Sequence, residues 1–270
     1  MKRFLIFIFF LSAVLALPGI AKRLTQGFRP VKMDLCFPYH PDWEVPLDPA
    51  ILSILNQPFF FIGKGSQSYV FASEDGKFVV KFFRFDDRRI KLFHQRQRQP
   101  ESAREKAEIV FAACKIAYDR LQEETGLVYM HLNLSQGTLP ILYCKDALGR
   151  PYKFPLDQCR FVLQKKATLF RDALLEARSN PDQMRARLDQ FIALLLSRTS
   201  KGVFNTDPTL SRNFGFLDHQ AIEIDFGNYR PASSRSPENE VKRYTDRLRE
   251  WLLEEAPEWV GYLDKRIEEI

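Results

Sequence analysis

The stretch that decides the fold reads Gly63-Lys64-Gly65-Ser66-Gln67-Ser68-Tyr69-Val70-Phe71. It joins two short apolar runs, residues 59–62 and 69–72, which have the aromatic and β-branched composition of strands. Glycine has no Cβ, so the backbone N–H groups of such a turn can approach a bound phosphate closely. A plain β-turn would also explain an isolated Gly-x-Gly. The second flanking run is a strand rather than a helix, which excludes a dinucleotide-binding Rossmann fold.

A lysine stands in the third β-rich run, residues 78–83, which reads Phe-Val-Val-Lys-Phe-Phe. Asp75-Gly76 is a strong tight-turn signal, and it predicts that the second and third runs form an antiparallel hairpin or meander. Lys81 is costly to bury among such neighbours unless an anion meets it. The alternative is that Lys81 lies on the solvent face of an alternating strand. With a glycine loop just before it, we favour the anion.

Three polar residues late in the chain have side chains that could act as oxygen ligands of a cation or as a proton acceptor. Asp207 and Asn213 lie in the segment 203–215, and Asp225 begins an Asp-Phe-Gly sequence at 225–227. A divalent cation such as Mg²⁺ that bridges phosphates needs hard oxygen ligands of this kind. Taken singly, Asp207-Pro208 is explained by a turn and Asp225 by the end of a strand.

As a set, these motifs resemble the protein-kinase-like fold. The glycine stretch looks like its Gly-rich loop with Ser68 in place of the third glycine, and Val79-Val80-Lys81 looks like the strand whose lysine holds the α- and β-phosphates. Asp207 and Asn213 resemble the catalytic aspartate and its metal-binding asparagine, and residues 225–227 match Asp-Phe-Gly in full. The order along the chain is that of the family, and the resemblance covers roughly residues 59–230.

This resemblance implies an α+β, two-lobed protein. The expected segments are a signal peptide or membrane anchor (1–21), an N-terminal extension (22–58), an antiparallel β-sheet N-lobe with one helix (59–166), and a reduced, mainly helical C-lobe (167–270). The implied activity is ATP-dependent transfer of the γ-phosphoryl group to a hydroxyl of a protein, sugar or lipid-linked sugar, with ATP and Mg²⁺. The implied site residues are Asp207 as proton acceptor, Asn213 and Asp225 as metal ligands, and, for the nucleotide, Gly63, Gly65, Ser68, Val70, Lys81 and Glu108.

Glu108 is the choice for the partner of Lys81. Residues 101–124 have the three- and four-residue apolar spacing of an amphipathic helix, and Glu108 lies nearest the edge of its apolar stripe. Further strands are expected at 127–132, 139–143 and 161–164, the last beginning a hinge over 161–166. Helices are expected at 49–55, 169–178, 181–200 and 238–255.

The sequence departs from the kinase pattern in the catalytic segment. Asn205-Thr206 stands where the family has His-Arg, and five residues instead of four separate Asp207 from Asn213. Forty-three residues follow Gly227, so the second lobe resembles that of an atypical or minimal bacterial-type kinase. These departures leave open an alternative, a catalytically inactive pseudokinase or an exported interaction protein on the same scaffold.

The N-terminus and the charge balance suggest location and exclude one class of partner. Met1-Lys2-Arg3 precedes an apolar run to residue 21, which is typical of a secretory signal, with a membrane anchor as the alternative. Forty Lys+Arg against 34 Asp+Glu give a net charge of +6. We find no basic reading element and expect no specific nucleic acid. Of the four cysteines, Cys114 should be a core residue, and Cys144 and Cys159 are the better disulfide candidates.

Overall fold

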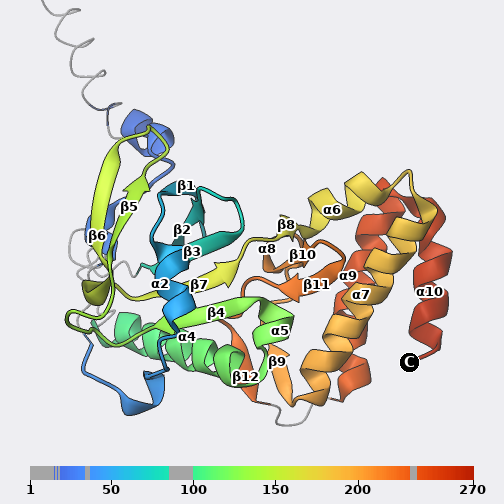
Figure 1. Ribbon diagram of the computed structural model, residues 1–270. Helices are drawn as coiled ribbons and strands as arrows, with labels where there is room; N and C mark the ends of the chain where they lie inside the picture. The colour runs from blue at the N-terminus through green and yellow to red at the C-terminus, as the bar shows by residue number, and fades with distance from the viewer. Residues whose placement is uncertain (1–14, 16, 18, 34–36, 85–99, 232–235) are drawn as a thin grey trace, which may run out of the picture. The chain divides into compact units, whose positions relative to one another are not determined.

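The computed structural model describes residues 15, 17, 19–33, 37–84, 100–231 and 236–270 (Figure 1). Most of the predicted signal segment, and Cys36, lie outside these residues, so export or anchoring stays a prediction. Among the described residues, no helix combines the length and the apolar character needed to span a membrane. The chain divides into two compact units, which are described separately: unit 1 comprises residues 1–103 and 131–163, and unit 2 comprises residues 104–130 and 164–270.

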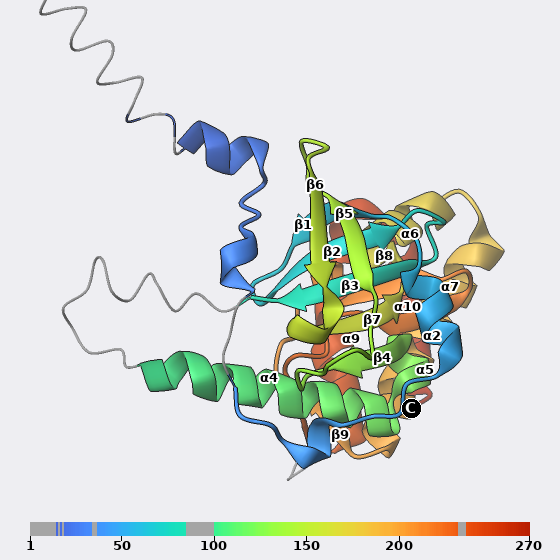
Figure 2. The same ribbon diagram turned by 60° about the vertical axis from the view of Figure 1, so that its left-hand side comes forward.

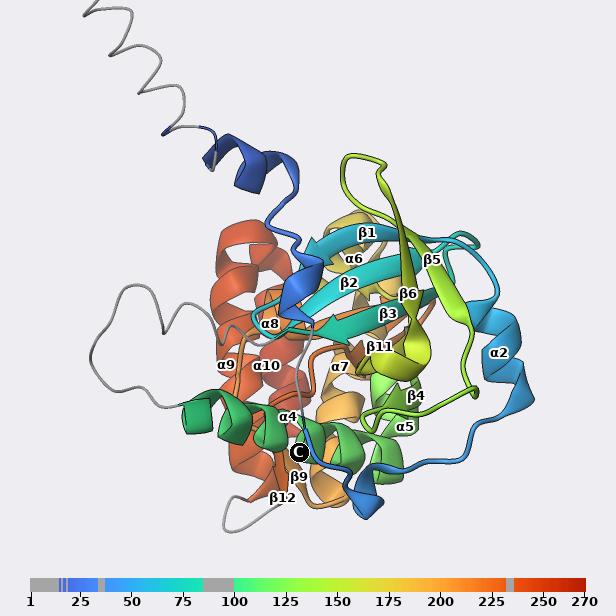
Figure 3. The same ribbon diagram turned by 90° about the vertical axis from the view of Figure 1, so that its left-hand side faces the viewer.

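The larger sheet is curled and mixed, with the strand order β4-β7-β3-β2-β1-β5-β6, and all of its strands except β4 lie wholly or mainly in unit 1. The strands are β1 (Phe59–Lys64), β2 (Ser68–Ser73), β3 (Phe78–Phe83), β4 (Leu127–His131), β5 (Ile141–Lys145), β6 (Pro151–Pro155) and β7 (Phe161–Lys165). Figure 3 shows β1, β2 and β3 side by side, and Figure 2 shows the long β5–β6 hairpin. The β1–β2, β2–β3 and β5–β6 pairs are antiparallel, as expected, whereas β1 and β5 pair in parallel. The expectation of a wholly antiparallel sheet is wrong at this pair.

One face of the β1–β3 meander is filled by aromatic rings. Alternation along the strands sends Tyr69 and Phe71 of β2 and Phe82 of β3 into the interior, where all three are fully buried. Phe28, from the N-terminal extension, packs edge-on against Tyr69 and Phe71 at 5.0 and 5.3 Å between ring centroids. The opposite face of these strands carries Val70 and Lys81, which are half-buried.

The N-terminal extension is short on regular structure, as its proline and aromatic content predicts. It contains two 3-10 turns, η1 (Pro30–Lys32) and η2 (Pro41–Trp43), and the helix α2 (Pro49–Leu55), which has the predicted bounds. Asp48 caps α2, because its carboxylate accepts a hydrogen bond from the backbone N–H of Ala50 at 2.8 Å.

Unit 2 is mainly helical. Its helices are α4 (Pro100–Arg120, whose first residues belong to unit 1), α5 (Gln122–Thr125), α6 (Phe170–Ala177), α7 (Pro181–Ser200), α8 (Leu210–Asn213), α9 (Pro237–Glu255) and α10 (Val260–Glu268). Figure 1 shows α7, α9 and α10 packed alongside one another. Their apolar faces enclose a core that includes Leu188, Phe191, Leu195, Tyr244 and Leu248, all fully buried.

Short strand pairs complete unit 2. β8 (Thr168–Leu169), β10 (Phe214–Leu217) and β11 (Gln220–Glu223) form a three-stranded sheet, and β9 (Val203–Asn205) pairs with β12 (Tyr229–Pro231). Two further 3-10 turns, η3 (Leu156–Gln158) in unit 1 and η4 (Pro257–Trp259) in unit 2, connect longer elements. The β9–β12 pair and the β10–β11 hairpin hold the segments that carry Asp207, Asn213 and Asp225.

Two expectations from the sequence need correction here. The helix predicted over 101–124 ends at Arg120, and the short α5 follows Leu121, whose backbone leaves the helical region at φ −136°. Cys114 is buried, as predicted, but Cys144 and Cys159 are free buried thiols and not a disulfide. Burial raises the pKa of the Cys159 thiol to about 11, so it is un-ionised at neutral pH.

Candidate functional site

The glycine turn between β1 and β2 is a close hairpin with open space beside it. The Gly65 N–H donates to the Ser68 carbonyl at 2.9 Å, and Gly63 lies opposite Val70 in the strand register. Neither glycine has a positive φ, so the backbone conformation does not require glycine at these positions. A Cβ on Gly63 would meet no atom within 4 Å, and one on Gly65 would meet only Ser68 Oγ at 3.5 Å. This space lets another group approach the backbone, as phosphate binding by a loop requires.

Lys81 and Val70 are cross-strand partners on one face of the sheet. The β2–β3 register places them directly opposite each other, so their side chains project from the same face. Both are half-buried, whereas Tyr69 and Phe82 on the opposite face are fully buried. Lys81 is therefore not on a fully solvated face. The structure brings together, within unit 1, the glycine turn, Ser68, Val70 and Lys81 that the sequence singled out.

Asp207 in unit 2 is held in a tight turn just after β9. Its backbone N–H donates to Asn205 Oδ1 at 2.8 Å, and its Oδ1 accepts from the backbone N–H and the hydroxyl of Thr209 at 3.1 and 2.7 Å. Burial acts to raise the pKa of the Asp207 carboxyl, but hydrogen bonds from Thr209 and Asn213 outweigh it and leave the pKa lowered. Asp207 is thus a fixed carboxylate, ionised at neutral pH.

Asn213 contacts the Asp207 turn in spite of the extra residue between them. The short helix α8 takes up that residue and ends at Asn213, whose Nδ2 donates to the Asp207 carbonyl at 3.1 Å. The Asn213 carbonyl in turn accepts from the backbone N–H groups of Ile224 and Asp225 at 2.6 and 3.3 Å. Asn213 therefore links the Asp207 turn to the Asp225 segment, and its side chain is almost completely buried.

Asp225 lies just beyond β11, at the start of the Asp-Phe-Gly turn. Its Oδ1 accepts from the Gly227 N–H at 3.3 Å, and its backbone carbonyl accepts from Asn205 Nδ2 at 3.1 Å. Asn205, which departs from the kinase pattern, is a fully buried connector between the Asp207 and Asp225 segments. The three predicted residues of unit 2 are therefore brought together by hydrogen bonds from the Asn205 and Asn213 side chains to the backbone and by backbone hydrogen bonds at Asn213.

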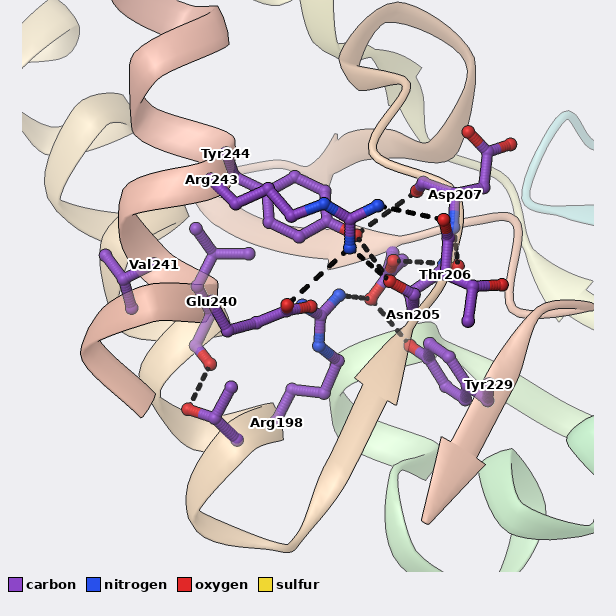
Figure 4. Close-up of polar contacts among 12 residues, drawn as sticks. Arg198, Asn205, Thr206, Asp207, Tyr229, Glu240, Val241, Arg243 and Tyr244 are labelled. Carbon is purple, nitrogen blue, oxygen red and sulfur yellow. Dashed lines mark hydrogen bonds and ion pairs between the residues drawn. The ribbon is translucent and has the colours of Figure 1, made fainter. Parts of the chain in front are cut away.

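A buried charge cluster, Arg198, Glu223 and Glu240, lies next to this loop, because Glu223 bonds to Asn205. Figure 4 labels Arg198 and Glu240 beside the segment from Asn205 to Asp207. Arg198 Nη1 lies 2.5 Å from Glu223 Oε2, and Nη2 lies 2.8 Å from Glu240 Oε1, with all three side chains fully buried. Glu223 also accepts from Asn205 Nδ2 at 2.7 Å and from the Tyr229 hydroxyl at 2.8 Å. Burial raises the pKa of the Glu223 carboxyl, and the Arg198 charge and these hydrogen bonds oppose that rise.

The oxygen atoms of Asn213 and Asp225 are suitable ligands for Mg²⁺. Asn213 uses its amide nitrogen on the Asp207 carbonyl, so the amide oxygen is the atom that would bind a cation, and Asp225 offers a carboxylate. Within the described residues, no group of three or more His, Cys, Asp and Glu side chains could hold a metal ion. Two protein ligands suit Mg²⁺, because this ion usually keeps several waters and binds substrate phosphates as well.

Glu108 has a different observed neighbour from the one predicted. Glu108 Oε1 lies 3.6 Å from Arg104 Nε one helical turn earlier, and about half of each side chain is exposed. Because Glu108 belongs to unit 2 and Lys81 to unit 1, the pairing of these two residues stays a prediction.

Sequence reasoning missed the residues that support the loop. These are Arg198, Asn205, Glu223, Glu240 and Arg243, of which the first four are completely buried. The sequence pattern that could have indicated them is a charged residue at a position where the helical or strand spacing expects a buried apolar one. Arg198 follows Leu195 by three residues and Phe191 by seven, and Glu223 alternates with apolar neighbours in Ala-Ile-Glu-Ile.

Comparison with known proteins gives only distant structural likenesses. No family model matches the sequence, and no curated protein matches it. Among solved structures, monomeric WbdD aligns with a TM-score of 0.42 and 18% identity, over 74% of this chain and 40% of that chain. A structure described as the bifunctional kinase-methyltransferase WbdD aligns with a TM-score of 0.36 and 16% identity, over 69% and 33%. The chain thus spans well under half of these proteins. At such TM-scores the likeness carries no argument, and function has to be argued from the residues themselves.

Proposed function

We propose that this protein is a kinase-like phosphotransferase that moves the γ-phosphoryl group of ATP to a hydroxyl acceptor. The observation that carries the proposal is the hydrogen-bonded set in unit 2, in which Asn213 binds the backbone on both sides of the site, at Asp207 and at Asp225. A carboxylate for the proton and two oxygen ligands for a cation are what phosphoryl transfer requires. Packing alone gives no reason for these three residue types to occur together.

In this reaction Asp207 accepts the proton of the acceptor hydroxyl. As that oxygen bonds to the γ-phosphorus, the bond from phosphorus to the β,γ-bridging oxygen breaks, and ADP leaves with the electron pair. The lowered pKa keeps Asp207 ionised before the step, and the Thr209 hydrogen bonds orient its carboxylate. Bound Mg²⁺ would neutralise charge on the phosphates, and Asn213 and Asp225 would hold it.

Unit 1 supplies the groups suited to the nucleotide. The backbone of the glycine turn would cover the phosphates, and Ser68 closes that turn through its carbonyl. Lys81 would pair with phosphate oxygens, because it is a half-buried ammonium group on the strand next to the glycine turn and opposite Val70. Val70, its cross-strand neighbour, would contact the base. Glu108 is proposed to orient Lys81.

The test is transfer from Mg·ATP by the full chain and by two site variants. Asp207→Asn should lower the transfer of labelled γ-phosphate to water or to the protein by about 10²–10⁴-fold while binding persists. Asp225→Asn should weaken Mg²⁺-dependent binding of ATP in calorimetry. Asp172→Asn, an exposed carboxylate in the first turn of α6, is the matched control.

Two outcomes would contradict the proposal. Undiminished transfer by Asp225→Asn would mean that the site is elsewhere. Binding of Mg·ATP by the wild type without any transfer would make the protein the non-catalytic binding module that the altered Asn205-Thr206 segment raised as the alternative.

A further inference from the structure

Two side chains of α9 contact the backbone that carries Asp207. Arg243 Nη1 donates to the Asn205 carbonyl at 3.0 Å, and its Nη2 donates to the Thr206 carbonyl at 2.9 Å. The Tyr244 hydroxyl lies 3.4 Å from the Asn205 carbonyl and 3.2 Å from the Asp207 carbonyl. Three consecutive carbonyls of the loop are therefore bound by two adjacent residues of one helix, as Figure 4 shows.

These contacts fix the direction in which the Asp207 side chain leaves the backbone. That direction depends on the two peptide planes that flank its Cα. Arg243 holds the carbonyl of the preceding plane, through Thr206, and Tyr244 holds the carbonyl of the following one. The forked guanidinium suits two neighbouring carbonyls, because its planar N–H groups cannot turn independently of one another.

Arg243 and Tyr244 are themselves in contact with the buried charge cluster of Arg198, Glu223 and Glu240. Arg243 Nη1 lies 3.7 Å from Glu240 Oε2, and the Arg198 guanidinium lies 5.0 Å from the centre of the Tyr244 ring. Phe214 packs against the same ring, edge to face at 5.4 Å. Tyr244 is completely buried, and the Arg243 side chain is 27% exposed. Because these neighbours fix the Arg243 and Tyr244 side chains, the position of α9 determines the position of the Asp207 loop.

We propose that Arg243 and Tyr244 are positioning residues that hold Asp207 in the orientation for proton acceptance, and this rests on the proposed function. Arg243 binds the backbone before Asp207 from a different helix, α9. The side chain of Thr206, the residue directly before Asp207, does not do this, because its hydroxyl bonds to the Asn228 carbonyl at 3.4 Å. Neither Arg243 nor Tyr244 contacts the reacting atoms. Their loss should slow the step and leave the affinity for the nucleotide unchanged.

The test separates the turnover number from binding in the full chain with Mg·ATP. Arg243→Ala should lower kcat about 10- to 100-fold, because misplacement of a catalytic group by about 1 Å is enough for that loss. Arg243→Lys should recover part of it, since one N–H group can still reach a carbonyl. Tyr244→Phe keeps the buried ring and should lower kcat by a smaller factor. The Kd for Mg·ATP, from calorimetry, should stay within about twofold of the wild-type value in all three.

The controls make equivalent changes elsewhere in unit 2. Arg249→Lys alters an arginine of the same helix, which pairs with Asp264 at 2.9 Å, and Tyr262→Phe removes a hydroxyl that bonds to Asp189 at 2.8 Å. Both should leave kcat unchanged. A fall in kcat equal to that of Arg243→Lys and Tyr244→Phe in these controls would overturn the proposal, as would a loss that appears in Kd alone.

A second measurement does not depend on activity. Amide hydrogen exchange at Asp207 and Thr209, whose N–H groups are bonded within the loop, should speed up in Arg243→Lys and Tyr244→Phe and stay unchanged in the controls. Unchanged exchange in these variants would refute the positioning role. If the wild type transfers no phosphate, the proposed function fails, and faster exchange in the variants would still show that α9 holds the loop.

Discussion

Replacing Arg198 with methionine tests whether the buried charge cluster stabilises unit 2. The substitution keeps a side chain of similar length and leaves the Glu223 and Glu240 carboxylates buried without their shared cation. Removing one partner of a buried ion pair typically costs about 3–5 kcal/mol, because the remaining charge has lost both water and counter-ion. Glu223 loses its only cation in the cluster, whereas Glu240 keeps Arg243 at 3.7 Å, so we expect the free energy of unfolding to fall by about that amount.

The assay can read unit 2 alone. Trp251 and Trp259 belong to unit 2, and Trp43 belongs to unit 1. Urea unfolding followed by tryptophan fluorescence in a Trp43→Phe background therefore reports on the unit that contains Arg198. Arg249→Met is the matched control, because its pair with Asp264 is about 40% exposed and should contribute only about 0–1 kcal/mol.

The loss should also depend on pH. Burial already raises the pKa of the Glu223 carboxyl, and removal of Arg198 takes away the charge that opposes the rise. With the folded-state pKa above the unfolded value, the folded state binds more protons, so the stability of the variant falls as pH rises. The deficit relative to wild type should be smaller at pH 5 than at pH 8. A loss below about 1 kcal/mol at pH 7, or an equal loss at both pH values, would refute this account of the cluster.

Two further predictions concern unit 1. Gly63→Val should leave the thermal midpoint unchanged, since a Cβ there meets open space, but should weaken Mg·ATP binding in calorimetry about tenfold or more; Gly76→Val, at φ +71°, should instead destabilise the fold by about 1–3 kcal/mol. Equal binding by Gly63→Val and wild type would argue against a phosphate at this turn. Asp146→Asn should reduce stability by about 1.5–3 kcal/mol at pH 7, because the carboxylate accepts from the backbone and side chain of Arg150. Hydrogen bonds lower the pKa of Asp146 in spite of its burial. The carboxylate therefore contributes to the free energy of unfolding above the unfolded-state pKa, and this contribution is lost as pH falls through the lower folded-state pKa. A stability difference between variant and wild type that persists undiminished below about pH 3 would contradict the assignment.

The strands and helices with strong periodic patterns could be predicted from the sequence. The hairpin through Asp75-Gly76 and the helix at 181–200 have their predicted positions, because local turn chemistry and apolar spacing determine them. The short strands β9, β10 and β12 of unit 2 could not be found in this way, as each is three or four residues long and is fixed by its pairing partner. The parallel β1–β5 pair joins segments about eighty residues apart, which local patterns do not encode.

For the candidate site, the sequence indicates which residues to consider, but only the structure shows which of them are in contact. Asp207, Asn213 and Asp225 could be named from their chemistry and order, but their spacing gave no assurance that they meet. The structure brings them together through Asn205, whose amide oxygen accepts from the Asp207 N–H while its nitrogen donates to Glu223 and to the Asp225 carbonyl. An asparagine has both an acceptor and a donor end, so one buried side chain can satisfy both segments at once.

The Asn205 contacts also show how the conformation of the loop around Asp207 is fixed. A loop conformation is fixed when its backbone N–H and C=O groups have partners, whichever side chains provide them. Around Asp207 those partners are Asn205, Asn213, Arg243 and Tyr244. The segment between Asp207 and Asn213 contains α8, and the helix ends at Asn213, whose side chain contacts the Asp207 carbonyl. The conformation of the loop around Asp207 is therefore determined by contacts from several segments of unit 2, none of which the spacing of Asp207 and Asn213 in the sequence reveals.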